Sequence, residues 1–172
     1  MTEKPDFSAH GINTPEFSLL GTAGWARVVH CHDGDSPTII LPVFGQMFKF
    51  VTRLYGIDTC EIASNAAANR DIAVRGRNRL IDLITNGVFS EKLKLEPNAV
   101  LSRKEIQAIF AKEPYVVWVE CLKMDKYGRV LVKMRSNPTQ TLFADTLIEE
   151  KLAYVYEGRT KLSEAEQLVL LS

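Results

Sequence analysis

Three clusters of charged and polar residues hold most of the chemistry in this 172-residue sequence, and each falls where a turn or a strand end is expected. In chain order they are Asp33-Gly34-Asp35, the segment from Arg53 to Glu61, and Asp125-Lys126-Tyr127-Gly128-Arg129. Asp35 and Asp58 supply carboxylate oxygens, the donors that Ca²⁺ and Mg²⁺ prefer. Two carboxylates leave several positions of a cation open for water and a substrate phosphate. The first two clusters therefore predict a site for a divalent cation.

Three further residues of these clusters indicate what such a cation would be used for. Glu61 follows Asp58 closely enough to position a metal-bound water without itself binding the metal. Arg53 and Arg129 carry permanently charged guanidinium groups that match phosphate oxygens. In-line attack on a phosphodiester builds charge on the equatorial oxygens, and arginines with a divalent ion stabilise that charge. The combined set predicts phosphodiester hydrolysis.

Each cluster also has a purely structural interpretation. Asp-Gly-Asp is a common hairpin turn, and residues 125–129 have the composition of a tight turn. Arg53 on a strand is compatible with a solvated arginine, and Asp58 with Glu61 is compatible with the start of a helix. Taken singly, these interpretations compete with the catalytic one. The occurrence of all three clusters in this order favours a shared site.

Five segments have the composition and alternation of β-strands: residues 25–32, 38–41, 47–55, 115–122 and 130–134. In the third segment, alternate residues from Phe48 to Leu54 fall on one face of the strand. Turn signals separate the strands at residues 33–35, 44–46 and 125–128. An antiparallel meander of this kind forms the wall of a small barrel.

Four helices are expected between and after the strands. The first begins at Ser64 or Asn65 and runs to about Asn86, where Gly87 ends it. The second follows a capping box formed by Ser102 and Glu105. The others cover residues 141–151 and 163–171. The order of elements predicts an α+β protein with a closed five-stranded OB-type β-barrel, about three flanking helices and one inserted helical segment.

The expected domain organisation is simple. Residues 1–23 are predicted to be an irregular arm, because glycine, proline and asparagine recur there without a sustained period. Residues 24–172 form the barrel domain, with an insertion at about 88–113. The length suits a single domain with a real hydrophobic core.

Composition restricts the class of protein. The formal net charge is zero, which counts mildly against a nucleic-acid-binding protein without excluding one, because a few arginines in one cleft suffice. No apolar run approaches the roughly 20 residues that span a bilayer, so no membrane association is expected. The first ten residues lack the apolar region of a secretory signal, and we expect a cytoplasmic protein. The three cysteines are too widely spaced to suggest a disulfide framework or a zinc ribbon.

The three clusters together resemble the thermonuclease family, whose prototype is staphylococcal nuclease. The resemblance extends from about Trp25 to Tyr156 and includes the pattern Arg53-Leu-x-Gly-Ile-Asp58-Thr59-x-Glu61. It implies an OB-type barrel with three helices and a Ca²⁺-dependent nuclease. The implied substrate is DNA or RNA, single-stranded or locally opened, and the implied products carry 3′-phosphates.

The resemblance also implies a role for each matching residue. Asp35 and Asp58 would bind Ca²⁺ through their side chains and Thr59 through its backbone carbonyl, with Asp33 in the outer shell. Glu61 would align or deprotonate the attacking water, while Arg53 and Arg129 would bind the scissile phosphate. Substrate contacts would come from Lys126, Tyr127 and a further tyrosine, which is either Tyr154 or Tyr156.

Several features depart from the family pattern. Ser36 and Cys60 replace a usual threonine and proline, and the hairpin between Asp35 and Arg53 is longer. The insertion at 88–113 is expected to shape access to the cleft. The alternative function is a catalytically inactive OB-type nucleic-acid-binding or protein-interaction module. Such modules typically lose an arginine or a carboxylate of the site, whereas this sequence keeps all of them. DNA-versus-RNA preference and oligomeric state are left open.

Overall fold

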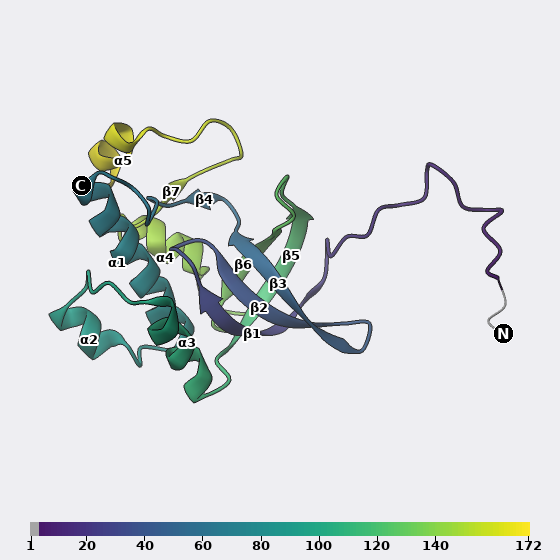
Figure 1. Cartoon of the computed structure of the whole chain (residues 1–172), viewed down its shortest axis with the longest axis horizontal. Helices are drawn as coiled ribbons and strands as arrows, with labels where there is room; N and C mark the ends of the chain where they lie inside the picture. Colours follow the sequence, from purple (N-terminus) through teal and green to yellow (C-terminus); the bar gives the residue numbers. More distant parts are fainter. Residues whose placement is uncertain (1–3) are drawn as a thin grey trace.

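The computed structural model describes residues 4–172, which form a β-barrel with helices gathered at one side (Figure 1). Residues 4–22 contain no helix or strand and extend away from the barrel on the side opposite the helices (Figure 1). The end of this arm is nevertheless anchored. Leu19 is buried in the core, and the backbone of Thr22 accepts a hydrogen bond from Cys121 N at 2.8 Å.

Five strands close the barrel in the order β1-β2-β3-β6-β5. Their bounds are Ala23–Cys31 for β1, Pro37–Val43 for β2, Gln46–Leu54 for β3, Val116–Met124 for β5 and Val130–Arg135 for β6. β3 and β6 run parallel, and the other neighbouring pairs are antiparallel. The predicted five-stranded OB-type barrel is therefore confirmed.

Alternation of apolar residues explains why these segments form a barrel. On β5, Val117, Val119 and Cys121 are buried, and their neighbours along the strand are more exposed. The same alternation places Ala26 and Val28 of β1 in the core. A period of two directs one side of each strand inward, which fills a small barrel with side chains.

The β2–β3 hairpin projects beyond the barrel (Figure 1). Phe44 and Gly45 form its turn with positive φ angles of 51° and 76°. Phe48 shares a strand face with Thr52 and Leu54, as predicted, but it lies on the projecting part and is exposed, whereas Thr52 and Leu54 are buried. Only the half of β3 nearest the helices contributes to the core.

A second, two-stranded sheet was not predicted from the sequence. It pairs β4, Ile57–Asp58, with β7, Tyr154–Val155, in antiparallel register. Asp58 lies directly opposite Tyr154 in this sheet. Gly56 precedes β4 with a φ of 85°, and its carbonyl accepts a hydrogen bond from Tyr156 N at 2.8 Å. This short sheet joins the second cluster to the segment after α4.

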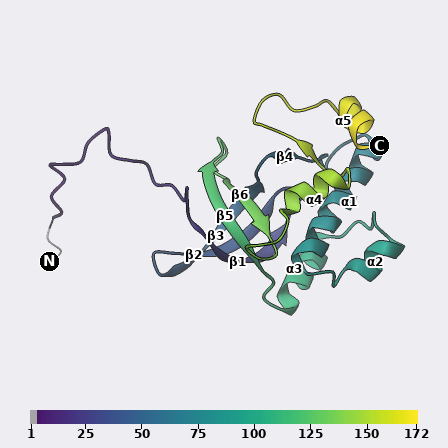
Figure 2. The same cartoon turned by 180° about the vertical axis from the view of Figure 1, so that it is seen from behind.

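The helices lie on one side of the barrel in both views (Figures 1 and 2). They are α1 (Ala67–Ile84), α2 (Ser90–Leu95), α3 (Arg103–Lys112), α4 (Phe143–Glu149) and α5 (Glu164–Leu171). The capping boxes at Ser102 and Ser163 are present. Over residues 4–172, no helix is long and apolar enough to cross a membrane.

The first helix begins later than predicted. Its N-cap is Ala66 rather than Ser64 or Asn65, and the residue makes no side-chain cap. The Ser64 hydroxyl instead accepts a hydrogen bond from Ala66 N at 3.1 Å and donates to Glu164. The serine therefore stabilises the turn before α1 and its contact with α5, while the N-cap of the helix is Ala66, one or two residues further on.

The insertion at 88–113 forms α2 and α3. Its apolar residues Ile106, Ile109 and Phe110 are buried in the main core, and α3 packs against β1. Phe110 also meets Tyr115 edge to face, with ring centroids 6.1 Å apart. The insertion thus extends the hydrophobic core on the β1 side of the barrel.

Candidate active site

Arg53 lies at the centre of the site, between two buried carboxylates. Its Nη2 is 3.0 Å from Asp35 Oδ2, and the same nitrogen donates a short hydrogen bond to Asp58 Oδ1. It is also 3.3 Å from the carbonyl oxygen of Ile57. All three charged residues are buried. The structure therefore brings the two predicted metal ligands and one predicted phosphate ligand to a single point.

The Asp-Gly-Asp turn is held in place by close packing. A Cβ on Gly34 would lie 3.1 Å from Thr59 Cγ2 and 3.2 Å from the carbonyl carbon of Gly76 in α1. The next residue is fixed by its backbone, because Leu54 N donates to the Asp35 carbonyl at 2.7 Å. A side chain at position 34 would therefore press against α1 and Thr59, which would have to shift to accommodate it.

Burial governs the electrostatics of this centre. Desolvation and the neighbouring Asp33 raise the pKa of Asp35 above its ordinary value, and Arg53 and Ser36 oppose that rise. Burial disfavours the charge on Arg53, but the carboxylates of Asp35 and Asp58 outweigh burial, so the pKa of Arg53 lies above its ordinary value. The centre concentrates negative charge that only a nearby cation makes stable.

Arg129 is positioned by its own turn. Asp125 Oδ1 accepts hydrogen bonds from the backbone of Tyr127 and of Arg129, each at 2.9 Å, and Asp125 Oδ2 accepts from Arg129 Nε at 2.7 Å. Burial alone would raise the pKa of Asp125, but these hydrogen bonds lower it. The third cluster is therefore a tight turn that also directs an arginine.

Ser36 links Arg129 to Asp35, which in turn contacts Arg53. Its hydroxyl donates to Asp35 Oδ1 at 2.7 Å and accepts from Arg129 Nη1 at 3.4 Å. Arg53 and Arg129 both line one cleft of about 530 Å³, which lies between the ends of β3 and β6 and the segment after β7. The predicted phosphate ligands thus share a cleft, although they are 76 positions apart in the sequence (129 minus 53).

Lys126 and Tyr127 line the same cleft. Tyr127 is 73% exposed, with Lys126 Nζ 5.1 Å and Arg129 Cζ 5.6 Å from its ring centroid. An exposed aromatic ring between two cations offers a stacking surface beside phosphate-binding groups. The role of Lys126 and Tyr127 in substrate contact stays a prediction.

The structure separates the two candidate tyrosines. Tyr156 lines the cleft, and Arg53 Cζ lies 5.8 Å from its ring centroid. Tyr154 is buried behind the cleft, and its hydroxyl donates to Asp58 Oδ2 at 2.5 Å. Burial and Asp58 raise the pKa of Tyr154. Of the two tyrosines, Tyr156 therefore lines the cleft, whereas Tyr154 holds Asp58.

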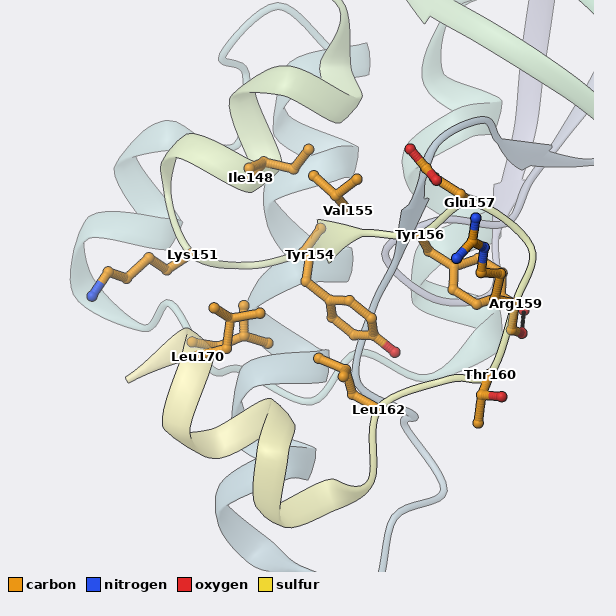
Figure 3. Close-up of a pocket in the computed structure, with 12 residues that line it drawn as sticks. Ile148, Lys151, Tyr154, Val155, Tyr156, Glu157, Arg159, Thr160, Leu162 and Leu170 are labelled. Carbon is orange, nitrogen blue, oxygen red and sulfur yellow. Dashed lines mark hydrogen bonds between the residues drawn. The ribbon is translucent and has the colours of Figure 1, made fainter.

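A second pocket of about 630 Å³ adjoins the cleft. Tyr154 and Leu162 lie close together inside it, and Tyr156 with Arg159 forms the wall that it shares with the cleft (Figure 3). Its remaining lining is largely aliphatic, with Ile148, Val155 and Leu170 among the residues labelled. Neither hollow is lined by the predicted metal ligands, but the first cleft is lined by both predicted phosphate-binding arginines, Arg53 and Arg129, and this pocket by neither.

Glu61 is linked to Asp58 by Lys161, a residue to which the sequence assigned no role. Lys161 Nζ is 2.9 Å from Glu61 Oε1 and 3.0 Å from Asp58 Oδ1. Burial opposes the charge of Lys161, but both carboxylates raise its pKa. Lys161 also lines the cleft. Lys161 and Ser36 are therefore the two site residues that sequence reasoning did not assign.

The donor set fits a divalent cation by chemistry. Asp35 and Asp58 are oxygen donors that converge on one positively charged nitrogen, and Thr59, the next residue, is buried beside them. Among residues 4–172, no cluster of three or more His, Cys, Asp or Glu side chains converges as a metal site. Backbone oxygen or solvent would therefore have to complete the shell of a cation at Asp35 and Asp58.

No protein-family model matches this chain, and no curated protein matches its sequence significantly. The structure itself shows a closed five-stranded barrel with flanking helices, which is compatible with OB-fold families.

Proposed function

We propose that this protein is a divalent-cation-dependent nuclease that hydrolyses phosphodiester bonds of DNA or RNA, with Ca²⁺ as the preferred cation. The observation that carries the proposal is the single cleft that Arg53 and Arg129 share, with Asp35 and Asp58 against Arg53. Two guanidinium groups in one cleft, one of them held between two oxygen ligands, match the charge that develops on a phosphodiester during in-line attack.

Each residue has a distinct task in this proposal. A cation held by Asp35, Asp58 and the Thr59 carbonyl would stabilise negative charge on the phosphate. Arg53 and Arg129 donate hydrogen bonds to the non-bridging oxygens of the same phosphate. Glu61, whose side chain is 60% exposed, accepts the proton of the attacking water. The products would carry 3′-phosphates.

The supporting residues narrow the substrate class. Tyr127 and Tyr156 present aromatic rings to the cleft, and Lys126 adds a positive charge at its rim. Exposed rings stack on unpaired bases, which a regular duplex keeps inside its own stack. We therefore propose single-stranded or locally opened nucleic acid as the substrate.

The proposal is tested by digesting labelled single-stranded and duplex oligonucleotides of DNA and RNA with CaCl₂ or with excess chelator. We expect cleavage only with the cation, faster on single strands, with 3′-phosphate termini on the products. Arg129→Gln, purified in parallel, controls for contaminating nucleases. Cation-independent cleavage by both preparations would refute the assignment.

The same experiment separates the catalytic function from the alternative of an inactive binding module. A module retains affinity for the oligonucleotides in the presence of Ca²⁺ and cuts none of them. One feature of the structure that favours this outcome is the contact of Lys161 with Asp58 and Glu61, which occupies carboxylates that catalysis needs.

A further inference from the structure

The contact between Lys161 and the catalytic carboxylates links two distant parts of the chain. Lys161 belongs to the segment between β7 and α5, 100 residues after Glu61. Its ammonium group is 3.0 Å from Asp58 Oδ1 and 2.9 Å from Glu61 Oε1. A single positive charge therefore bridges a predicted metal ligand and the predicted general base.

The two ends of this contact differ in exposure. The Asp58 side chain is 1% exposed and Lys161 is 45% exposed. A buried carboxylate requires a compensating charge, whereas a half-exposed lysine is readily solvated when it leaves. The ion pair with Asp58 therefore keeps Lys161 at the site rather than free in solvent. A divalent cation, which carries a higher charge, would compete with Lys161 for the same oxygen of Asp58.

The backbone on either side of Lys161 is anchored. The carbonyl of Arg159 accepts a hydrogen bond from Tyr156 OH at 2.7 Å, and the carbonyl of Leu162 accepts from Gln167 Nε2 at 3.1 Å. The segment between these anchors carries Thr160 along the rim of the adjoining pocket (Figure 3). These two anchors keep the Lys161 ammonium group near the carboxylates. After displacement by a cation, Lys161 can therefore return to Asp58 and Glu61 without a large movement of the backbone.

We propose that Lys161 is an internal counter-ion that competes with the divalent cation for Asp58, holds Glu61 at the same time, and thereby sets the cation concentration at which the site becomes active. The inference rests on the proposed function, since it assigns Asp58 to the cation and Glu61 to the water. Binding of the cation releases Lys161 from Asp58. Release also frees Glu61, so the general base becomes available only in the cation-bound state.

The test measures Ca²⁺ affinity by isothermal titration calorimetry in the absence of nucleic acid. Lys161→Met removes the competing charge, and we expect it to bind CaCl₂ about fivefold or more tightly than the parent chain. Lys161→Arg keeps the charge and is expected to bind as weakly as the parent. Lys104→Met, on the exposed face of α3 away from the cleft, controls for a general loss of positive charge.

A second measurement uses the parent chain alone. Endoproteinase Lys-C cuts after lysine, and we expect CaCl₂ to accelerate cleavage of the Lys161–Leu162 bond while cleavage after Lys104 stays constant. This readout remains informative if Lys161→Met fails to fold.

The outcomes are distinct from those of the nuclease assay. Tighter Ca²⁺ binding by Lys161→Met, with parental binding by Lys161→Arg and Lys104→Met, supports the inference. Equal or weaker binding by Lys161→Met overturns it, as does the absence of Ca²⁺ binding in both chains. Cleavage of nucleic acid with Ca²⁺ but not with chelator would still support the proposed function in those cases.

Discussion

Tyr154 and Asp58 face each other across the two-stranded sheet of β4 and β7, and the Tyr154 hydroxyl donates to Asp58 Oδ2 at 2.5 Å. The other carboxylate oxygen of Asp58 meets Arg53 and Lys161. The sheet therefore fixes the position of this aspartate, and the side-chain contacts fix the direction of its two oxygens.

Replacing Tyr154 with phenylalanine removes one hydrogen bond from a buried carboxylate. We expect Tyr154→Phe to lower the free energy of unfolding by about 1–3 kcal/mol in urea titrations, because Asp58 loses a donor that water cannot replace. The matched control is Tyr156→Phe, whose hydroxyl donates to the exposed carbonyl of Arg159. An effect at Tyr156 as large as that at Tyr154 would contradict the distinction between the two tyrosines.

Replacing Arg53 with glutamine leaves two buried carboxylates without their shared cation. We expect Arg53→Gln to lower the free energy of unfolding by about 3–5 kcal/mol in the absence of divalent ions. Added CaCl₂ should recover part of this loss, since the cation replaces the missing positive charge.

The control for Arg53 is Arg75→Gln, which breaks an exposed pair. Arg75 Nη1 lies 3.8 Å from Asp71 Oδ2, and the side chains are 44% and 41% exposed. Solvent screens such a pair, so its loss should cost at most about 1 kcal/mol. Equal costs at both arginines would show that the site does not depend on Arg53 for stability.

The inserted segment is expected to act on stability rather than on access. Phe110 is buried in the main core, and none of the residues that line the cleft comes from the described part of 88–113. Phe110→Ala should lower the free energy of unfolding by about 3–5 kcal/mol. Below its melting temperature, the variant should still cut nucleic acid at close to the parental rate.

Phe44→Ala is the control for Phe110, because Phe44 is 86% exposed at the tip of the β2–β3 hairpin. Its replacement should change the free energy of unfolding by less than about 0.5 kcal/mol. A folded Phe110→Ala protein with no residual cleavage would restore the original expectation that the insertion shapes the cleft.

The barrel was predictable from sequence because its strands alternate and its turns contain Asp-Gly, Phe-Gly and Tyr-Gly pairs. The β4–β7 sheet was not, since strands of two residues have no measurable period. A shared site was expected because all three clusters occur together in this order, and scattered residues could not share one phosphate. Lys161 lay outside that pattern, and only the folded chain brings its ammonium group to Asp58.

Helix boundaries illustrate a competing use of polar side chains. Serine is a residue type that often caps a helix, but the Ser64 hydroxyl bonds to Ala66 N and to Glu164 of α5 instead. A local sequence pattern cannot predict a contact with a residue 100 positions further along the chain. The capping box at Ser102 was predictable because both of its partners lie within the same turn.

Glu61 is expected to act on the water rather than on the substrate. Glu61→Gln keeps the size of the side chain and removes the base, so cleavage should slow by about 10²–10⁴-fold while oligonucleotide affinity is retained. Glu157→Gln removes the same charge from a residue that lines the cleft, and it should cut at close to the parental rate. A parental rate for Glu61→Gln would show that another group is the base.

The most direct test of the nuclease assignment compares the parent chain with Arg129→Lys, measuring single-turnover cleavage and affinity for one labelled oligonucleotide on the same preparations. Lysine keeps the charge but loses the forked geometry that Asp125 and Ser36 hold in place. We predict cleavage by the parent with CaCl₂, none with chelator, and a rate about 10²–10³-fold lower for Arg129→Lys with little change in affinity. Failure of the parent to cut with CaCl₂, or equal rates for the two proteins, would contradict the account.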